Sequence, residues 1–427
     1  MKYFVYHNTK SLMKKAAFYS ISVLFFGGIL SCDSDGDNIK GGDGYLPYAE
    51  PISIELEEKV GTDNAFAFDL FKTTYRLAEE SNVFVSPLSV NWALSMTMNG
   101  AKGTTLEEVK DVLRAEGYSL DDINAYNKSL REALVTVDKS TTLSIANSIW
   151  YNNLYTFEND FISVNRDSYD AEIRAADFNS SNTVNQINDW VSNKTNKKIP
   201  KIIEELSPDA MICLINAIYF KGIWREKFNA NATKNEDFYA EDGVSMGKVK
   251  MMNQTNHFAY SGDENCGYLM LPYGNGAFSM IVMLPHEGEK VDDVISNLDS
   301  KSWDNAMNMD SYEVTLRLPC FKAECSYEMQ EDILPDMGMI VPFTEFANFG
   351  GMIKSPPIMI SKVIHKTFIE VNEEGTEAAA ATLVEGMVGA PPPAPKIDYV
   401  VNRPFAFAIR ENSTGVILFI GKIGKIS

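Results

Sequence analysis

Basic residues are scarce in this chain. Its 427 residues include 38 Lys and Arg against 58 Asp and Glu, which gives a formal net charge of −20. Binding to the phosphate backbone of a nucleic acid needs a concentrated basic surface. We therefore expect no nucleic-acid partner.

Recognisable catalytic motifs are missing as well. Only three histidines, His257, His286 and His365, follow the first 31 residues. The chain contains neither the H-E-x-x-H pattern of zinc proteases nor the G-x-S-x-G turn of serine hydrolases, and its glycines form no phosphate-binding loop. These absences predict that the chain is not an enzyme and that it uses no cofactor.

Cysteine is rare, with five in the whole chain. Cys213, Cys266, Cys320 and Cys325 lack the spacing of a metal-binding ribbon or of a redox pair, so we predict no metal site. Cys213 lies in an apolar strand context, where a free buried thiol is the usual state. A disulfide among the other three stays open.

The fifth cysteine follows a targeting segment. Several lysines precede the apolar run Ala16–Leu30, which has the basic-then-hydrophobic order of a secretory signal. The run is shorter than the roughly 20 residues that a membrane-spanning helix needs. It ends in Ile-Leu-Ser-Cys at Cys32, which resembles a bacterial lipoprotein signal; an ordinary secretory peptide that happens to end in cysteine is the alternative.

This resemblance implies a signal peptide over residues 1–31 and a lipidated Cys32 as the mature N-terminus. The acidic, glycine-rich residues 32–51 then form a solvated tether. We expect a bacterial cell-envelope protein, lipid-anchored and either periplasmic or surface-exposed. Which membrane face carries it stays open.

Residues 52–427 read as one α+β domain. The composition, 45% hydrophobic and 22% charged, is that of an ordinary globular protein with a large core. Apolar periodicity predicts a helix within Pro51–Arg76, and the nearly unbroken apolar run Met211–Phe220 predicts a central, fully buried strand. Further strands are predicted at Leu143–Tyr151, Gly267–Pro272, Phe278–Pro285, Val314–Pro319 and Val363–Val371, with a hairpin of Phe405–Arg410 and Val416–Lys422.

The stretch Glu373–Ala390 fits two structures. Thr376, Glu377 and the alanines that follow suit the first turns of a helix. As a strand, the same residues place the even-numbered positions from Thr376 to Val388, all uncharged, on one face, and both Glu377 and Glu385 on the other. The segment can therefore join a sheet but does not need one to be stable. This is what we expect of a loop that becomes a strand only after a change elsewhere in the molecule.

Six separated segments of the chain form a recognisable set: Asn82-Val-Phe-Val-Ser-Pro-Leu-Ser with Gly100-Ala-Lys-Gly-Thr-Thr; Leu143-Ser-Ile-Ala-Asn; Asn216-Ala-Ile-Tyr-Phe-Lys-Gly-Ile-Trp; Leu318-Pro-Cys-Phe-Lys; His365-Lys-Thr-Phe-Ile-Glu-Val-Asn-Glu-Glu-Gly-Thr-Glu-Ala-Ala-Ala-Ala-Thr; and Asn402-Arg-Pro-Phe-Ala-Phe. Together they resemble the serpin family of protease inhibitors, occur in the family's order and span the chain from about residue 52 to its end. Asn196 departs from the family's usual Gly, and Cys320 departs from its usual Lys.

The resemblance implies a single domain with a large central β-sheet, additional sheets, about eight or nine helices and an exposed reactive loop over residues 373–395. In this family the target protease attacks the loop as a substrate and forms an acyl-enzyme, and the cleaved loop then inserts into the central sheet and traps it. The implied partner is a target protease, and we expect the chain to be a monomer.

Residue roles follow from the matching positions. Gly375 is the implied hinge, followed by Thr376, Glu377, Ala378, Ala379, Ala380, Ala381 and Thr382. A polar cluster under the point where the sheet opens would comprise Asn82, Ser86, Ser89, Asn216 and His365, with Trp224 near the top of the opening. Without the resemblance, His365 would read as an ordinary buried histidine and Trp224 as core packing.

The bond that is cut follows by counting. The family's cleaved residue lies about fourteen positions after the hinge glycine, which gives Gly389-Ala390, with Met387 and Val388 as alternatives. Residues 375–395 contain no Lys or Arg, so the loop offers no basic side chain to the specificity pocket of a trypsin-like protease. Elastase-like or subtilisin-like targets fit, and a papain-like cysteine protease stays open. A non-inhibitory surface lipoprotein with a binding or structural role is the alternative function.

Overall fold

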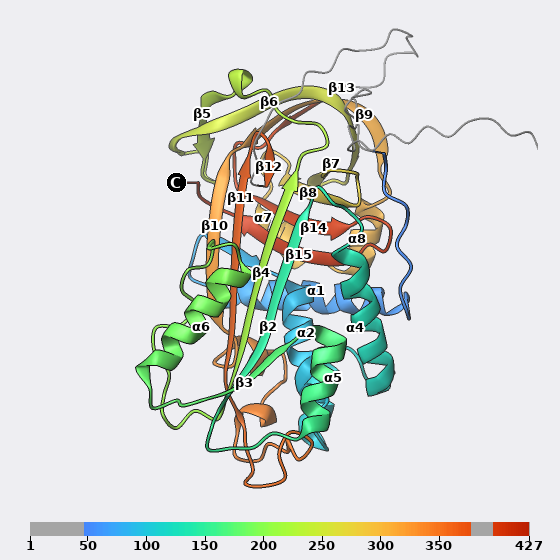
Figure 1. Cartoon of the computed structure of the whole chain (residues 1–427). Coiled ribbons are helices and arrows are strands. Elements are labelled where there is room, and N and C mark those ends of the chain that lie inside the picture. The colour runs from blue at the N-terminus through green and yellow to red at the C-terminus, as the bar shows by residue number, and fades with distance from the viewer. Residues whose placement is uncertain (1–46, 377–395, 427) are drawn as a thin grey trace, which may run out of the picture. The chain divides into compact units, whose positions relative to one another are not determined.

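Two β-sheets organise the part of the chain that this computed structural model describes, residues 47–376 and 396–426 (Figure 1). The larger sheet follows the order β1-β15-β14-β8-β7-β6-β9-β13, with β5 paired to β6, and the smaller sheet follows β10-β11-β12-β4-β2-β3. The strands are β1 (Asn82–Val85), β2 (Thr142–Asn152), β3 (Glu172–Ala176), β4 (Ile212–Ile223), β5 (Lys234–Tyr239), β6 (Ser245–Gly262), β7 (Cys266–Pro272), β8 (Phe278–Pro285), β9 (Asp310–Pro319), β10 (Phe321–Glu328), β11 (Ile360–Asn372), β12 (Gly375–Thr376), β13 (Lys396–Val400), β14 (Phe405–Glu411) and β15 (Ile417–Ile423).

Helices cover both sheets and fill the space between them. In the described residues there are nine α-helices, so the predicted α+β fold is confirmed. The helices are α1 (Lys59–Leu77), α2 (Pro87–Met98), α3 (Thr104–Val112), α4 (Leu120–Leu134), α5 (Asn159–Tyr169), α6 (Ser181–Lys194), α7 (Val291–Ser296), α8 (Ser300–Ala306) and α9 (Ile333–Asp336), with short 3-10 turns η1 (Ala230–Ala232) and η2 (Val341–Phe343).

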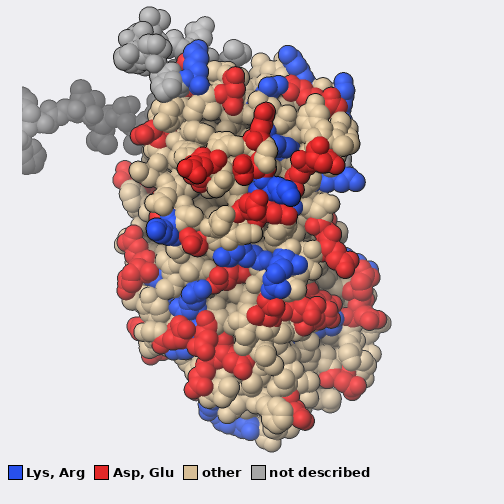
Figure 2. Space-filling model, turned by 180° about the vertical axis from the view of Figure 1, so that it is seen from behind, with Lys and Arg blue, Asp and Glu red and all other residues tan. Residues whose placement is uncertain are grey.

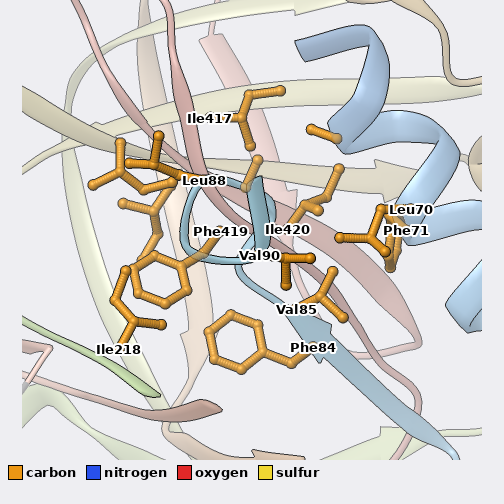
Figure 3. Close-up of a cluster of buried hydrophobic side chains, with 14 of the residues drawn as sticks. Leu70, Phe71, Phe84, Val85, Leu88, Val90, Ile218, Ile417, Phe419 and Ile420 are labelled. Carbon is orange, nitrogen blue, oxygen red and sulfur yellow. The ribbon is translucent and has the colours of Figure 1, made fainter. Parts of the chain in front are cut away.

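Helix α2 lies at the centre of the core. Ser86 accepts a hydrogen bond from the Ser89 amide and caps the helix, and Pro87 occupies its first turn, where a missing N–H costs nothing. All its residues are buried, because it contacts β2 and β4 of the smaller sheet and β15 of the larger one. Figure 3 shows Leu88 and Val90 of α2 in one cluster of buried hydrophobic side chains with Ile218 of β4 and with Phe419 and Ile420 of β15.

A second apolar cluster covers the opposite face of the six-stranded sheet. Trp190 and Val191 of α6, with Ile202 from the segment that follows it, pack with Ile215 of β4 and Ile364 of β11. The six-stranded sheet is therefore buried on both faces, which accounts for the unbroken apolar run of β4. The predicted central strand is thus found at Ile212–Ile223.

The predicted first helix is too long at its start. Helix α1 begins at Lys59 rather than near Pro51, and Leu56 has a positive φ of 48°, which a continuous helix does not allow. Residues 47–58, which we call the N-terminal segment, run along the side of the body before α1 (Figure 1). Within the described residues, no helix is both long and apolar enough to cross a membrane.

The smaller sheet has two parallel pairings, one between β4 and β11 and the other between β2 and β3. Strands β4 and β11 pair from Ile360 opposite Ile212 to Phe368 opposite Tyr219, and parallel pairing is slightly less stable per residue than antiparallel pairing. We call the line between β4 and β11 the seam. Beyond Phe368 the two strands separate, and the two residues of β12 lie between them.

Candidate functional site

The candidate site begins where β12 enters the sheet. Thr376 pairs with Val371 of β11 on one side and with Gly222 of β4 on the other, both antiparallel. A tight turn connects Asn372 of β11 to Gly375 of β12. The chain between β11 and the loop thus already supplies the first two residues of an additional strand. We call this end of the sheet the hinge end.

Gly375 is required by both conformation and space. Its φ of 141° lies in a region that L side chains rarely adopt. A Cβ added there would lie 2.2 Å from the carbonyl oxygen of Gly222 and 2.7 Å from the backbone nitrogen of Trp224. Only glycine lets the turn approach β4 this closely.

Thr376 points into the protein. Its side chain is 1% exposed, and its Oγ1 lies 2.9 Å from the hydroxyl of Tyr273, which hydrogen-bonds to it. Burial raises the pKa of Tyr273, so its hydroxyl stays protonated at neutral pH. The face that the sequence assigned to the sheet is therefore the buried face at this position.

Side chains from three segments hold the turn before Gly375. The Thr233 hydroxyl donates to the Glu373 carboxylate at 2.8 Å, and Lys227 forms an ion pair with Glu374 at 3.0 Å. Cys320 also hydrogen-bonds to Glu373, and burial, then the negative charge of that carboxylate, raise the pKa of its thiol to about 12. The departure from the family's usual Lys at this position thus leaves a neutral donor beside Glu373.

Trp224 lies at the hinge end, as the sequence analysis placed it. Its backbone N–H donates to the carbonyl of Glu374 at 2.8 Å, and its indole Nε1 donates to the carbonyl of Asn372 at 2.9 Å. Its ring stacks on Tyr273 with centroids 4.5 Å apart and an interplanar angle of 10°. One tryptophan therefore contacts both ends of the turn.

A buried polar row crosses the seam farther along the sheet. His365 of β11 faces Asn216 of β4, which in turn faces Asn147 of β2. The Ser86 amide donates to His365 Nε2 at 3.0 Å, and His365 Nδ1 donates to Asn216 Oδ1 at 2.6 Å. Asn216 Nδ2 donates to Asn147 Oδ1 at 2.6 Å and to the Ser89 carbonyl at 3.0 Å.

This arrangement determines the state of the histidine. Because Nε2 accepts from a backbone amide, the single proton of a neutral ring lies on Nδ1. Burial lowers the pKa of His365 to about 3, so the ring is neutral at physiological pH. His365 thus serves as a hydrogen-bonding link between helix α2 and the seam.

Of the predicted cluster, the structure brings together Ser86, Ser89, Asn216 and His365, but not Asn82. The Asn82 side chain instead accepts from the amides of Gly424 and Lys425 at 2.9 and 3.0 Å. Its grouping with the cluster is corrected, because it joins the start of β1 to the chain segment after β15.

Sequence reasoning missed Asn147, Tyr273 and Thr233. Asn147 could have been noticed as a polar residue at a buried position within an apolar strand. Tyr273 forms an isolated β-bridge with Trp224, and Thr233 directly follows η1; nothing in the sequence indicates that either lies near the hinge. Asn196 has a φ of 50°, which agrees with the family's usual Gly at that position.

Several predicted site residues lie outside the described residues. These are the hinge positions after Thr376, from Glu377 to Thr382; the cleavage candidates Gly389, Ala390, Met387 and Val388; and Cys32. Their assignments remain predictions. The end of the predicted tether, residues 47–51, is described and contacts the body.

Two other kinds of site, a metal centre and a nucleic-acid surface, lack support among the described residues. In the parts described, no group of three or more His, Cys, Asp or Glu residues could hold a metal ion, and Cys213, Cys266, Cys320 and Cys325 are all free thiols. Figure 2 shows acidic and basic side chains interspersed over one face, without the broad basic field that nucleic acids require.

The comparisons with known proteins converge on one family. Residues 62–426 match the family model described as "Serpin (serine protease inhibitor)". Human Serpin B3 is 36% identical over 383 residues, which cover 84% of this chain and 97% of that protein. Leukocyte elastase inhibitor A of Rattus norvegicus is 34% identical over 382 residues, covering 86% of this chain and 99% of that protein. The crystal structure of the thermophilic serpin tengpin in its native state superposes with a TM-score of 0.80 at 33% identity, covering 89% of this chain and 97% of that one.

These matches correct the prediction about enzymes. The missing catalytic motifs predicted only that the chain is not an enzyme. The matched family is instead described as serine protease inhibitors, and one relative is named as an inhibitor of leukocyte elastase. Inhibition is not catalysis, and the family description places the chain among inhibitors of enzymes.

Proposed function

This chain belongs to the serpin family, and we propose that it inhibits a serine protease as a suicide substrate. The protease serine attacks the carbonyl carbon of Gly389, and the amine of Ala390 leaves as the peptide bond breaks. The new N-terminal part of the loop then inserts between β11 and β4 while still joined to the protease by the ester. Displacement of the protease before water reaches the ester would trap the acyl-enzyme.

The observation that carries this proposal is the position of β12. Its two residues already pair with β4 and β11 at the hinge end, and the eight residue pairs of the seam lie directly ahead. Insertion would exchange one parallel ladder for two antiparallel ones, so each new residue would pair on both sides. The start of the additional strand therefore exists before any cleavage.

The register of β12 gives the position that each loop residue would take. Thr376 pairs with Val371 of β11 and Gly222 of β4. In antiparallel pairing, Thr382, six residues later, would lie opposite the residues six earlier in those strands, which are His365 and Asn216. Because Thr376 points inward and side chains alternate, Thr382 would also point inward. A hydroxyl would thus enter the polar row at the level where the bond between His365 and Asn216 must break.

The length of the inserted strand fits the proposed displacement. From Gly375 to Gly389 the chain adds about 15 residues, or roughly 50 Å at about 3.3 Å each. The same register would bring Gly389 beside Ile358, just before β11 begins. The attached protease would thus be carried from the hinge end to the opposite end of the sheet.

The loop chemistry narrows the target. The residues from Leu383 to Ala390 are small or aliphatic apart from Glu385, which suits elastase-like or subtilisin-like pockets, and a papain-like cysteine protease is a further candidate. Relatives named leukocyte elastase inhibitors at 34% identity support the elastase-like choice. The non-inhibitory alternative is less well supported, because the hinge carries a small, neutral residue on its buried face.

A direct test mixes the chain with pancreatic or neutrophil elastase. We expect a covalent complex that survives SDS, and denaturation in SDS should separate from it a peptide that begins at Ala390, because β14 and β15 hold that peptide in the folded sheet. The matched control is elastase whose active-site serine is replaced by alanine, which should bind without forming the complex. Cleavage without any complex, across elastase, subtilisin and papain, would rule out inhibition by trapping.

We also propose that the chain is anchored in a bacterial cell envelope through lipid on Cys32, on the periplasmic or the external side. The signal-like run Ala16–Leu30 that ends at this cysteine supports the proposal. Radiolabelled palmitate should be incorporated by the wild-type chain and not by Cys32→Ser. Equal labelling of both would contradict the assignment.

A further inference from the structure

A cavity of about 710 Å³ lies between the start of α1, helix α8 and the turn that joins β14 to β15. Binding sites for small molecules have volumes of roughly 300–1,000 Å³, so this cavity is of a suitable size. None of its lining residues belongs to β4, β11 or β12, which form the seam and the hinge end. The cavity is therefore separate from the candidate site described above.

Arg410, the penultimate residue of β14, is the only basic residue among the described residues that line the cavity. Its guanidinium donates to the backbone carbonyls of Glu411 at 3.4 Å and Asn412 at 3.1 Å, and within the described part of the chain it forms no ion pair. Burial lowers the pKa of Arg410 more than the nearby charges of Glu411 and Asp304 raise it. A partly desolvated cation thus faces the cavity without an anionic partner.

The carboxylate next to Arg410 in the sequence is already used by the turn. Glu411 is buried, and its two oxygens accept from the amides of Ser413 and Thr414 at 2.9 and 2.8 Å and from their hydroxyls at 2.7 and 2.6 Å. These four donors occupy the lone pairs of the carboxylate. Glu411 therefore fixes the turn and does not neutralise Arg410.

A second side chain holds the same turn from α1. Asn64 Nδ2 donates to the carbonyl of Gly415 at 2.9 Å, and Asn64 Oδ1 accepts from the amide of Ile417 at 3.0 Å. The wall of the cavity that carries Arg410 is thus fixed by hydrogen bonds from two elements. A ligand would bind to a preformed wall, which reduces the entropy lost on binding.

The other walls of the cavity are apolar and acidic. Val60 and Trp303 are buried and Met307 is half-buried, so they form an apolar surface beside Arg410. Exposed carboxylates line the remainder of the cavity: Glu57, Glu58 and Asp304. A simple anion would be repelled by these three carboxylates, and a simple cation would leave Arg410 unpaired. A ligand with both charges and an apolar body satisfies all three walls.

We propose that this cavity binds a short peptide with free termini and apolar side chains. The peptide carboxylate pairs with the Arg410 guanidinium, whose planar fork suits a carboxylate. The apolar side chains lie against Trp303 and Met307, and the terminal ammonium lies among the exposed carboxylates. The volume corresponds to a ligand larger than a free amino acid. This inference does not depend on the proposed inhibition or on the proposed lipid anchor.

Isothermal titration calorimetry of the full-length chain with the tripeptide Ala-Leu-Phe tests the assignment. We expect the free tripeptide to bind, its C-terminal amide to bind at least about tenfold more weakly because it lacks the carboxylate, and its N-acetyl form to bind roughly threefold more weakly because the acidic residues are exposed. No heat of binding up to roughly 10 mM tripeptide would overturn the proposal. Equal binding of the amide would overturn the role of Arg410, and equal binding of the N-acetyl form would overturn the doubly charged ligand.

Two variants locate the bound peptide. Arg410→Met should lower the affinity at least about tenfold and should bind the free tripeptide and its amide equally, because the two changes remove the same interaction. Arg174→Met removes the same charge from β3 of the smaller sheet and should bind like the wild type.

The second variant fills the cavity. A Cβ added to Gly61, which lines the cavity, would meet no neighbouring atom within 4 Å, and leucine favours a helix over glycine. Gly61→Leu should therefore fold, and its side chain should reduce binding at least about tenfold by occupying the space of the peptide. Wild-type affinity in Gly61→Leu or in Arg410→Met would show that the peptide does not bind in this cavity.

Discussion

His365 and Asn216 face each other across the seam, and His365 Nδ1 lies 2.6 Å from Asn216 Oδ1. A strand that enters between β11 and β4 must separate this pair. The bond is fully buried, so its loss leaves two polar groups without partners unless the incoming strand supplies them. The register of β12 assigns that task to Thr382.

Replacing Thr376 with arginine should convert an inhibitor into a substrate. Thr376 is buried against Tyr273. Burying an unpaired guanidinium in that position would cost roughly several kcal/mol of free energy. Elastase should still cut the loop, but the ratio of cleaved product to SDS-stable complex should rise at least about tenfold. Thr376→Ser, which keeps the hydroxyl, is the matched control and should remain an inhibitor. Unchanged trapping by Thr376→Arg would contradict insertion of this residue into the sheet.

Stability should depend on His365 as the pH falls. Burial lowers its pKa to about 3 in the folded chain, against about 6.5 in the unfolded chain. Below pH 6.5 the unfolded chain takes up the extra proton, so this contribution to stability is complete above about pH 6.5 and is lost as the pH falls toward 3.

The slope is at most about 1.4 kcal/mol per pH unit. The free energy of unfolding of the intact protein, measured with urea between pH 7 and 5, should therefore change more steeply with pH for the wild type than for His365→Gln, whose side chain cannot bind the proton. Parallel pH profiles of the two proteins would show that His365 is not the titrating group.

A single methyl group at Gly375 should displace the hinge. A Cβ there would lie 2.2 Å from the Gly222 carbonyl oxygen, at a φ of 141° that alanine avoids. We expect Gly375→Ala to lose about 1–3 kcal/mol and to change the fluorescence of Trp224, whose indole donates to Asn372. Gly61→Ala, in an open part of α1, should leave the Trp224 fluorescence unchanged and should raise stability slightly, because alanine favours a helix over glycine. A Gly375→Ala protein with wild-type stability and emission would show that β12 is not held in the sheet.

The thiols should resist alkylation in the folded protein. Burial raises the pKa of Cys213 to about 12 and that of Cys266 further, and burial together with Glu373 raises that of Cys320 to about 12. At pH 8 only about one thiol in ten thousand would be ionised at such a pKa. Mass spectrometry after iodoacetamide treatment should find these three unmodified in the folded chain and modified in urea. Rapid labelling of Cys320 in the native protein would mean that its contact with Glu373 is absent.

The sequence predicted the fold well where the burial of apolar side chains, rather than local secondary-structure propensity, determines the structure. The apolar run at Met211–Phe220 indicated a strand buried on both faces, and the structure has α2 on one face and α6 on the other. It failed at residues 51–58, because apolar spacing alone does not distinguish a helix from a segment that packs Ile54 and Leu56 against the body one by one. The positive φ of Leu56 excludes this residue from a continuous helix, so α1 begins only after it.

The site was predictable only in part. Ser86, Ser89, Asn216 and His365 lie far apart in sequence, and it was the resemblance to a family, rather than any local pattern, that grouped them. Asn82 was grouped wrongly because its place at the start of β1 is near the cluster in sequence but not in space. Tyr273, which bonds Thr376, could not be found, since its contact depends on how a turn of the other sheet lies against the hinge.

The structure of the loop-cleaved protein tests the central claim most directly. After cleavage by elastase, the residues beyond Thr376 should form a strand between β11 and β4 over the whole seam. Thr382 should lie between His365 and Asn216, and those two side chains should no longer bond to each other. A cleaved protein in which β4 and β11 remain paired, with the His365–Asn216 bond intact, would contradict insertion and the trapping mechanism that depends on it.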